Sequence, residues 1–265
     1  MVTTLNRRGK REGNAGEDDG RIATNLRTLL IIETIAKSGV PLSPTEINAH
    51  IGLPKQSIHR LCQTLVDEGF LIRDVSGKRL HAAPRTMDMA RGLFTNRQMS
   101  AARRAILLEL SERTGETVNF VLPEPDGMTY LDRVETDWLF RIELPIGSRV
   151  PFHCTASGKC YLASLETRQL NSLINTLHFE ARTPNTITTP EALVKEIAKV
   201  RQQGYAVDHE ELFEGMIALA VPVEDAQGRF MAAIAFHGPT LRLTRDGLMD
   251  HLNAMRDGAG KLARL

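Results

Sequence analysis

The sequence predicts an α+β protein of two domains, in which a winged helix-turn-helix precedes a larger mixed α/β domain. The chain has 265 residues, which is long for one compact domain and comfortable for two. Residues 21–82 show three helical patterns followed by two short strand-like runs, whereas helical and strand-like runs alternate over residues 100–265. A content of 42% hydrophobic and 25% charged residues is typical of a globular chain that buries a core.

Composition also narrows the cellular setting. No run approaches the roughly 18 uninterrupted apolar residues of a membrane helix, and the N-terminus is charged, so we expect a cytoplasmic protein with no membrane partner. The three cysteines, Cys62, Cys154 and Cys160, include no Cys-x-x-Cys pair. We therefore expect neither a disulfide framework nor a metal site, and no cofactor.

Residues 1–20 are polar and almost free of apolar side chains, so we expect a disordered tail. Residues 21–81 hold eight Lys or Arg against five Asp or Glu, a modest basic bias of the kind that a phosphate-contacting module needs. The tail has its own basic cluster, which is either solvated or in contact with DNA phosphates: Arg7, Arg8, Lys10 and Arg11.

The first helix is predicted over residues 21–38 and ends at Gly39. Ile31 and Ile35 fall on the side opposite its main apolar stripe, which predicts a second buried surface such as a dimer contact. The main stripe consists of Ile22, Leu26, Leu29, Leu30, Ile32 and Ala36.

A second helix begins at the segment SPTE, with Ser43 as N-cap, Pro44 at the first helical position and Glu46 completing a capping box. It ends near Gly52, and a third helix runs from there to Gly69.

Two short strands, residues 70–74 and 78–81, follow around a turn at residues 75–77. Helix, helix-turn-helix and hairpin in this order predict a winged helix-turn-helix.

The polar side of the third helix carries the residue types that contact bases and phosphates, because Arg suits guanine and Gln suits adenine in the major groove. A solvated helix face has a similar composition, but the basic hairpin that follows favours DNA binding. The predicted DNA-contacting residues are Ser43, Thr45, Lys55, Gln56, Ser57, His59, Arg60, Gln63, Arg73, Lys78 and Arg79.

A linker helix is predicted over residues 83–99, and the second domain occupies residues 100–265. Within this domain we expect helices at residues 100–114, 155–164, 166–176, 190–203 and 243–264, and strands at 118–122, 128–134, 138–144, 204–208, 216–223 and 230–237.

The sequence gives little support to catalysis, and we expect no enzyme. The segment SGK at residues 157–159 lacks the glycine and the hydroxyl residue that complete a phosphate loop. His153, Cys154 and Asp208 form a Cys-His-Asp set only if the fold brings them together. Two alternatives stay open: an enzyme acting on a small acid, and a DNA-binding protein whose second domain only oligomerises.

Ten short segments, in order along the chain, together resemble the IclR family of bacterial transcriptional regulators. The resemblance covers nearly the whole chain from residue 21. The segments are GLPK (52–55), SIHRL (57–61), ERTGET (112–117), YLDRVE (130–135), PIGS (145–148), HCTASGK (153–159), TPNTIT (183–188), RQQGYAVD (201–208), AVPV (220–223) and HGP (237–239).

The resemblance implies a GAF-like second domain with a central antiparallel sheet, and a homodimer or homotetramer that binds a palindromic operator in double-stranded DNA. It further implies a repressor controlled by a small organic or aromatic acid as effector. By position, the effector-binding residues are Leu139, Ile142, Ala156, Ser157, Asp208, Met216, Ala218, Ala235 and His237.

Two of these positions depart from the family pattern, which implies a different effector. Ala218 stands where many relatives carry Cys, and His237 where a small hydroxyl residue is common. Ala156 and Ser157 begin a predicted helix whose free N–H groups suit a carboxylate, to which we expect His237 to add a cation. Core packing is an equally good interpretation of Met216, Ala218 and Ala235.

Overall fold

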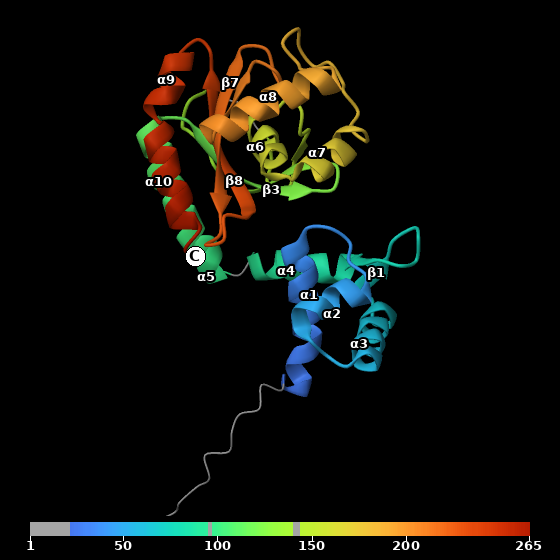
Figure 1. Cartoon of the computed structure of the whole chain (residues 1–265). Coiled ribbons are helices and arrows are strands. Elements are labelled where there is room, and N and C mark those ends of the chain that lie inside the picture. The colour runs from blue at the N-terminus through green and yellow to red at the C-terminus, as the bar shows by residue number, and fades with distance from the viewer. Residues whose placement is uncertain (1–21, 95–96, 140–143) are drawn as a thin grey trace, which may run out of the picture. The chain divides into compact units, whose positions relative to one another are not determined.

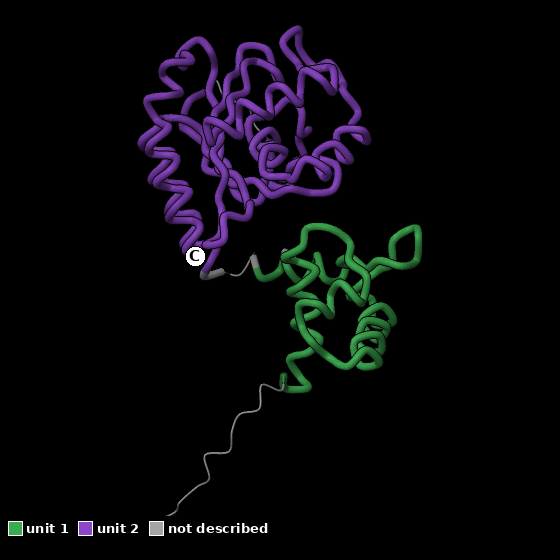
Figure 2. The backbone as a smooth tube through the Cα atoms, in the orientation of Figure 1, with its two compact units in different colours: residues 1–94 green, residues 95–265 purple. Residues whose placement is uncertain are grey.

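The structure is a computed structural model, and it describes residues 22–94, 97–139 and 144–265. The chain divides into two compact units, Met1–Phe94 and Thr95–Leu265 (Figure 2). The division falls inside the segment 83–99, where the sequence places a linker helix. The tail of residues 1–20 lies outside the described residues.

The first unit is a winged helix-turn-helix, as the sequence predicts. Ser43 caps α2, and its hydroxyl and the Glu46 carboxylate form the expected capping box. Leu42 forms a β-bridge with Leu80 and so adds a third short segment to the wing. The elements are η1 (Thr24–Leu26), α1 (Arg27–Ser38), α2 (Pro44–Ile51), α3 (Lys55–Asp67), β1 (Leu71–Arg73), β2 (Leu80–Ala82) and α4 (Pro84–Phe94).

The sequence prediction was wrong about which side of α1 faces the core. Ile31 and Ile35 are 0% and 6% exposed and pack in the core of the unit, whereas Leu26 and Leu29 are 49% and 57% exposed. Two residues one turn apart form a narrow stripe that fits between α2 and α3. Ile22 and Ile32 of the predicted stripe are partly buried and also pack against this core, so the prediction failed for the exposed Leu26 and Leu29 and for the place given to Ile31 and Ile35.

The second unit is built on a six-stranded antiparallel sheet of order β5-β4-β3-β8-β7-β6, so the expected central antiparallel sheet is confirmed. Among the described residues, no helix combines the length and apolar character that crossing a bilayer requires. The elements are α5 (Arg97–Thr114), β3 (Thr117–Glu124), β4 (Gly127–Val134), β5 (Arg149–Val150), α6 (Ala156–Ser164), α7 (Thr167–Ile174), α8 (Pro190–Gln203), β6 (Ala206–His209), β7 (Met216–Glu224), β8 (Phe230–Pro239), α9 (Arg245–Asp250) and α10 (Leu252–Leu262).

Helices cover both faces of this sheet (Figure 1). On one face α5 and α10 pack over a core that includes Leu107, Phe236 and Met255, and on the other α6 packs with α8. Because strand side chains alternate, Val118 of β3 joins the α5 side while Val121 faces the α6 side.

Small side chains let α6 lie close to the sheet. Ala206, Ala220 and Ala235 are neighbours in register across β6, β7 and β8, and all three are buried against Ala156 and Cys160 of α6. Side chains of this size bring the start of α6 near the sheet, which is where the cavity described below is found.

One predicted strand is not observed in the described residues. Trp138, Leu139 and Leu144, at the two ends of the predicted strand 138–144, adopt no strand conformation, and residues 140–143 lie outside the described residues. The neighbour of β4 is instead the two-residue strand β5. The Leu139 side chain is 100% exposed, so its apolar character did not indicate a buried strand position.

We expect a Gly158→Ala substitution to destabilise the second unit. A Cβ on Gly158 would lie 2.4 Å from the carbonyl oxygen of Phe152, so α6 would have to move. We expect a loss of about 2–4 kcal/mol in the free energy of unfolding, measured by chemical denaturation.

Gly260→Ala in α10 is the matched control, because the nearest atom to its added Cβ is an Arg264 nitrogen at 3.8 Å. That substitution should stabilise by about 0.5–1 kcal/mol, since Ala is the better helix former. Equal effects of the two substitutions would contradict the close approach of α6.

Candidate functional site

In the first unit, the turn between α2 and α3 is fixed by hydrogen bonds. The Asn48 side chain donates to the Leu53 carbonyl oxygen at 2.7 Å and accepts from the Leu53 amide at 2.9 Å. Gly52 ends α2 with a φ of 76°, a left-handed conformation that favours glycine. This clamp sets the angle at which α3 leaves α2, and the sequence analysis did not identify Asn48.

The polar side of α3 is exposed, as a DNA-reading helix requires. Ile58, Cys62 and Leu65 are buried beneath it. Ser57 is half-buried, and the other predicted contacts on this helix are exposed: Lys55, Gln56, His59, Arg60 and Gln63.

The cations of the wing hold it against the helices. Arg73 donates to the Gln63 side chain of α3 at 2.8 Å, and Arg79 donates to the Glu46 carboxylate of α2 at 2.8 Å. Lys78 is exposed at the turn of the wing.

The two predicted contacts at the start of α2 differ in exposure. Thr45 is exposed, whereas Ser43 is half-buried and its hydroxyl accepts the Glu46 amide at 3.3 Å. Capping therefore engages Ser43 within the chain.

The second unit contains a cavity of about 40 Å³ between the start of α6 and the sheet. Seven of the nine predicted effector-binding residues line it. Leu139 does not, since its side chain is fully exposed, and Ile142 lies outside the described residues. The seven are Ala156, Ser157, Asp208, Met216, Ala218, Ala235 and His237.

The sequence analysis missed several lining residues. Asn119 had the clearest signal, because it is a polar residue inside the apolar run of residues 118–122 and is only 1% exposed. The remaining ones are aromatic, aliphatic or small, and nothing in the sequence distinguishes them from ordinary core: Tyr130, Leu144, Thr155, Leu212, Phe213 and Ile217.

Strand register explains why Asp208 and His237 face the same cavity. Ala218 of β7 pairs with Asp208 on one side and with His237 on the other. Residues opposite each other in neighbouring antiparallel strands point to the same face. The small Ala218 side chain leaves space between the two polar groups.

His237 is uncharged, contrary to our expectation of a cation. Burial, with a smaller contribution from the positive charge of Arg133, lowers the pKa of His237 to about 3. Its Nδ1 lies 3.1 Å from the amide nitrogen of Asn119, and its buried Nε2 has no hydrogen-bond partner in the described part of the chain. The cavity therefore holds a neutral imidazole with one unused nitrogen.

Asp208 holds its proton more tightly than an ordinary aspartate. Burial and the nearby charge of Glu211 raise the pKa of Asp208 to about 7, although one carboxylate oxygen accepts the Glu211 amide at 2.7 Å. At neutral pH a large fraction of this group is a neutral carboxyl that can donate a hydrogen bond.

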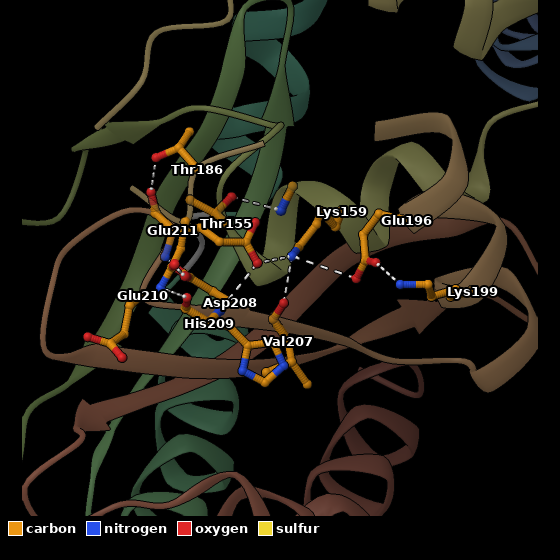
Figure 3. Close-up of polar contacts among 12 residues, drawn as sticks. Thr155, Lys159, Thr186, Glu196, Lys199, Val207, Asp208, His209, Glu210 and Glu211 are labelled. Atoms are coloured by element: carbon orange, nitrogen blue, oxygen red, sulfur yellow. Dashed lines mark hydrogen bonds and ion pairs between the residues drawn. The ribbon is translucent and has the colours of Figure 1, made fainter. Parts of the chain in front are cut away.

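A buried ion pair holds the wall of the cavity in place (Figure 3). Lys159 of α6 is fully buried, and its ammonium donates to the Val207 carbonyl oxygen at 2.6 Å and to the Glu211 carboxylate at 2.5 Å. Glu196 of α8 approaches the same ammonium at 4.0 Å. The pair ties α6 to β6 and to the loop after it.

Threonine hydroxyls hold that loop from outside. Thr186 donates to the Glu211 carbonyl oxygen at 2.7 Å, and Thr183 donates to the Glu210 carbonyl oxygen at 2.6 Å. Glu210 has a φ of 58°, which is rare for a residue with a side chain, and its carboxylate accepts the Gly215 amide at 2.7 Å. The loop is therefore fixed at both ends, and its residues Leu212 and Phe213 line the cavity.

The first turn of α6 offers backbone donors to the cavity. Thr155 is the N-cap, and its hydroxyl accepts the Gly158 amide at 3.1 Å. The amides of Ala156 and Ser157 precede the first intrahelical hydrogen bond, so they have no acceptor within the helix. Such groups favour a negatively charged ligand.

The Cys-His-Asp alternative gains no support from the local chemistry. Burial raises the pKa of Cys154 to about 12, so its sulfur stays a thiol at neutral pH. The His153 ring nitrogen Nε2 lies 3.2 Å from the Glu180 carbonyl oxygen. A nucleophilic cysteine needs the thiolate, which this environment disfavours.

We expect Asp208→Asn to stabilise the protein above about pH 7. Because the folded state keeps the Asp208 proton between about pH 4 and 7, where the unfolded chain has lost it, the parent's free energy of unfolding falls as pH rises through this window. The asparagine does not titrate, so the variant should gain up to about 4 kcal/mol relative to the parent, measured by denaturation at pH 4 and pH 8.

Asp225→Asn serves as the control. Hydrogen bonds from Arg229 lower the pKa of Asp225, so its stabilisation is lost only as pH falls through the acidic range. That variant should gain nothing between pH 4 and 8, and a similar gain in both variants would refute the assignment to Asp208.

Comparison with known proteins agrees with a helix-turn-helix in the first unit and a separate second domain. Residues 93–264 match the family described as bacterial transcriptional regulator IclR C-terminal, and residues 26–75 match the IclR helix-turn-helix domain. The chain is 39% identical over 242 residues to a probable transcriptional regulator, SauR, of Cupriavidus necator, covering 91% of this chain and 96% of the relative. It is 33% identical to the transcriptional repressor IclR of Escherichia coli, covering 86% of this chain and 84% of that protein.

Two solved structures resemble this chain in fold. The IclR protein of Thermotoga maritima superposes with a TM-score of 0.61 at 26% identity, covering 91% of this chain and 97% of that one. The inducer-binding domain of PobR from Acinetobacter, a double mutant in complex with 3-hydroxybenzoic acid, gives a TM-score of 0.56 at 29% identity, covering 60% of this chain and 94% of that domain. The chain belongs to the IclR family of bacterial transcriptional regulators.

Proposed function

We propose that this protein is a sequence-specific repressor whose affinity for its operator is controlled by a small organic acid bound in the cavity of the second unit. The observation that carries the proposal is the buried Nε2 of His237, which has no hydrogen-bond partner in the described residues and whose residue lines the cavity. Ala156 and Ser157, at the start of α6, line the same cavity, and the first amides of a helix have no intrahelical acceptor. An acceptor-rich anion such as a carboxylate matches these groups.

The DNA-binding part of the proposal rests on the first unit. The exposed side of α3 enters the major groove, where Arg60 and Gln56 reach base edges, while Lys78 of the wing contacts phosphates. Two copies of the chain, as a homodimer or within a homotetramer, place two such helices on a palindromic operator with half-sites about one helical turn apart.

The effector part rests on cavity size and on relatives. A volume of about 40 Å³ admits a few water molecules or a ligand of a few non-hydrogen atoms, so an aromatic acid requires the cavity to widen. The PobR domain was solved with 3-hydroxybenzoic acid, so a relative of this fold holds an aromatic acid. A ligand that binds one arrangement of the oligomer better than the other shifts the population between them and thereby changes operator affinity.

Substitution of Arg60 tests the reading helix. We expect Arg60→Ala to weaken binding to an operator fragment, selected with the parent protein, by about 10- to 100-fold, because a bidentate contact to guanine is lost. Fluorescence anisotropy at one fixed salt concentration measures the effect. Arg168→Ala, which removes one exposed positive charge from α7 in the second unit, is the control and should change affinity little. Equal losses in the two variants would count against α3 as the reading helix.

A panel of small acids tests the effector site. Acetate, propionate, lactate, benzoate and 3-hydroxybenzoate are each added to the parent, to Asp208→Ala and to Phe179→Ala as a control outside the cavity lining. An acid at 100 times its dissociation constant should stabilise the fold by about 2.7 kcal/mol, seen as a rise in melting temperature. The rise should vanish in the Asp208 variant and persist in the control.

If no acid in the panel raises the melting temperature of the parent, the acid-effector proposal fails. A second domain that only oligomerises then becomes the better interpretation. Consumption of an acid on incubation would instead support the enzyme alternative.

A further inference from the structure

Three neighbouring strands place Arg133, Asn119 and His237 in a hydrogen-bonded series that ends in the cavity. The Arg133 guanidinium, which is buried, donates to the Asn119 carbonyl oxygen Oδ1 at 3.3 Å. The Asn119 amide nitrogen Nδ2 lies 3.1 Å from Nδ1 of His237. Asn119 pairs in register with Arg133 on one side, and its strand pairs with that of His237 on the other.

A β-bulge in β4 brings Arg133 to the cavity side of the sheet. Val121 pairs with Tyr130 and the preceding Phe120 pairs with Asp132, so Leu131 is an extra residue. Because of it, Tyr130 and Arg133 lie on one face, and the guanidinium carbon of Arg133 is 5.9 Å from the centre of the Tyr130 ring. A bulge commonly redirects a side chain in this way.

The series has a fixed direction, because arginine carries donors only. Arg133 therefore requires the oxygen of Asn119 on its side, and this turns the amide N–H of Asn119 toward His237. Nδ1 of His237 must then accept, and in a neutral imidazole the proton resides on Nε2. That nitrogen is the one without a partner in the described residues, and its residue lines the cavity.

The charge of Arg133 acts in the same direction as its hydrogen bond. Burial lowers the pKa of His237, the positive charge of Arg133 lowers it further, and the ring therefore stays neutral. Among the described residues that line the cavity, the other ionisable side chains are Tyr130 and Asp208. Burial raises the pKa of both, which keeps Tyr130 protonated at neutral pH and Asp208 protonated at mildly acidic pH.

We propose that Arg133 is a positioning residue which, through Asn119, makes His237 a neutral Nε2–H donor, and that the cavity thereby selects ligands with an acceptor oxygen at His237 and rejects amines. This deepens the proposed function and rests on it for the identity of the ligand. The tautomer of His237, however, is a property of the ligand-free protein.

The tautomer is tested first, in the full chain labelled with ¹⁵N-histidine. Long-range ¹H–¹⁵N spectra distinguish the two ring nitrogens, and His237→Gln assigns the signal. We expect only Nε2 to carry a proton between pH 5 and 8, with no titration in that range. A proton on Nδ1, or titration of His237 within that range, would overturn the proposal without any ligand.

Arg133→Met then removes the charge and the donors at the head of the series. We expect a mixed tautomer signal from His237 and about 3- to 10-fold weaker acid binding. The control is Arg149→Met, which removes an exposed arginine paired with Asp126 near the other end of β4. Unchanged His237 signals in folded Arg133→Met would also overturn the proposal.

Ligand preference is tested with two probe pairs of equal carbon skeleton, propionate against propylamine and benzoate against benzylamine. The acids should bind and the amines should not. His237→Gln keeps an N–H donor and should retain acid affinity within about threefold, whereas His237→Leu should weaken it by about 10- to 100-fold. Acid binding that His237→Leu leaves intact, or binding of either amine, overturns this inference but not the proposed function. Failure of all five panel acids to bind overturns both.

Discussion

The buried ammonium of Lys159 is the interaction on which the cavity depends. It joins α6 to the end of β6 and to Glu211, so it fixes the helix start that offers free amides and the strand that carries Asp208. Removing one partner of a buried ion pair leaves an uncompensated charge, at a cost of about 3–5 kcal/mol. The second oxygen of Glu211 is buried without a hydrogen-bond partner in the described residues. The cost of removing this carboxylate from water is therefore only partly compensated.

Near this ion pair, the cavity is lined by polar side chains that carry little charge. Burial pushes Asp208 toward its neutral carboxyl and His237 toward its neutral imidazole, and each then offers a hydrogen-bond donor. At mildly acidic pH, Asp208 would place no like charge in the way of an anion entering such a site. Ionisation of Asp208 at higher pH would oppose it, which links occupancy of the cavity to proton concentration.

In the first unit, the polar side of α3 is held in a fixed position and remains exposed to solvent. The Asn48 clamp and the buried side of α3 set the geometry, and the exposed contacts of Arg73 with Gln63 and of Arg79 with Glu46 add little energy of their own. Because such exposed contacts are weak, they cost little to exchange for other partners.

Local signals in the sequence determined most of the elements and their order, although not the strand β5 beside β4. The capping box of Ser43 and Glu46, the glycine stop at Gly52 and the apolar runs of β7 and β8 depend on neighbours in the chain, and all are found in the structure. Half of the cavity-lining residues also followed from the family resemblance, by their position in ordered motifs. The tertiary structure alone decided which side of α1 is buried, that Leu131 forms a bulge which turns Arg133 toward the cavity, and that His237 is neutral. Each of these depends on atoms brought together from distant strands and helices, and no spacing along the chain encodes that proximity.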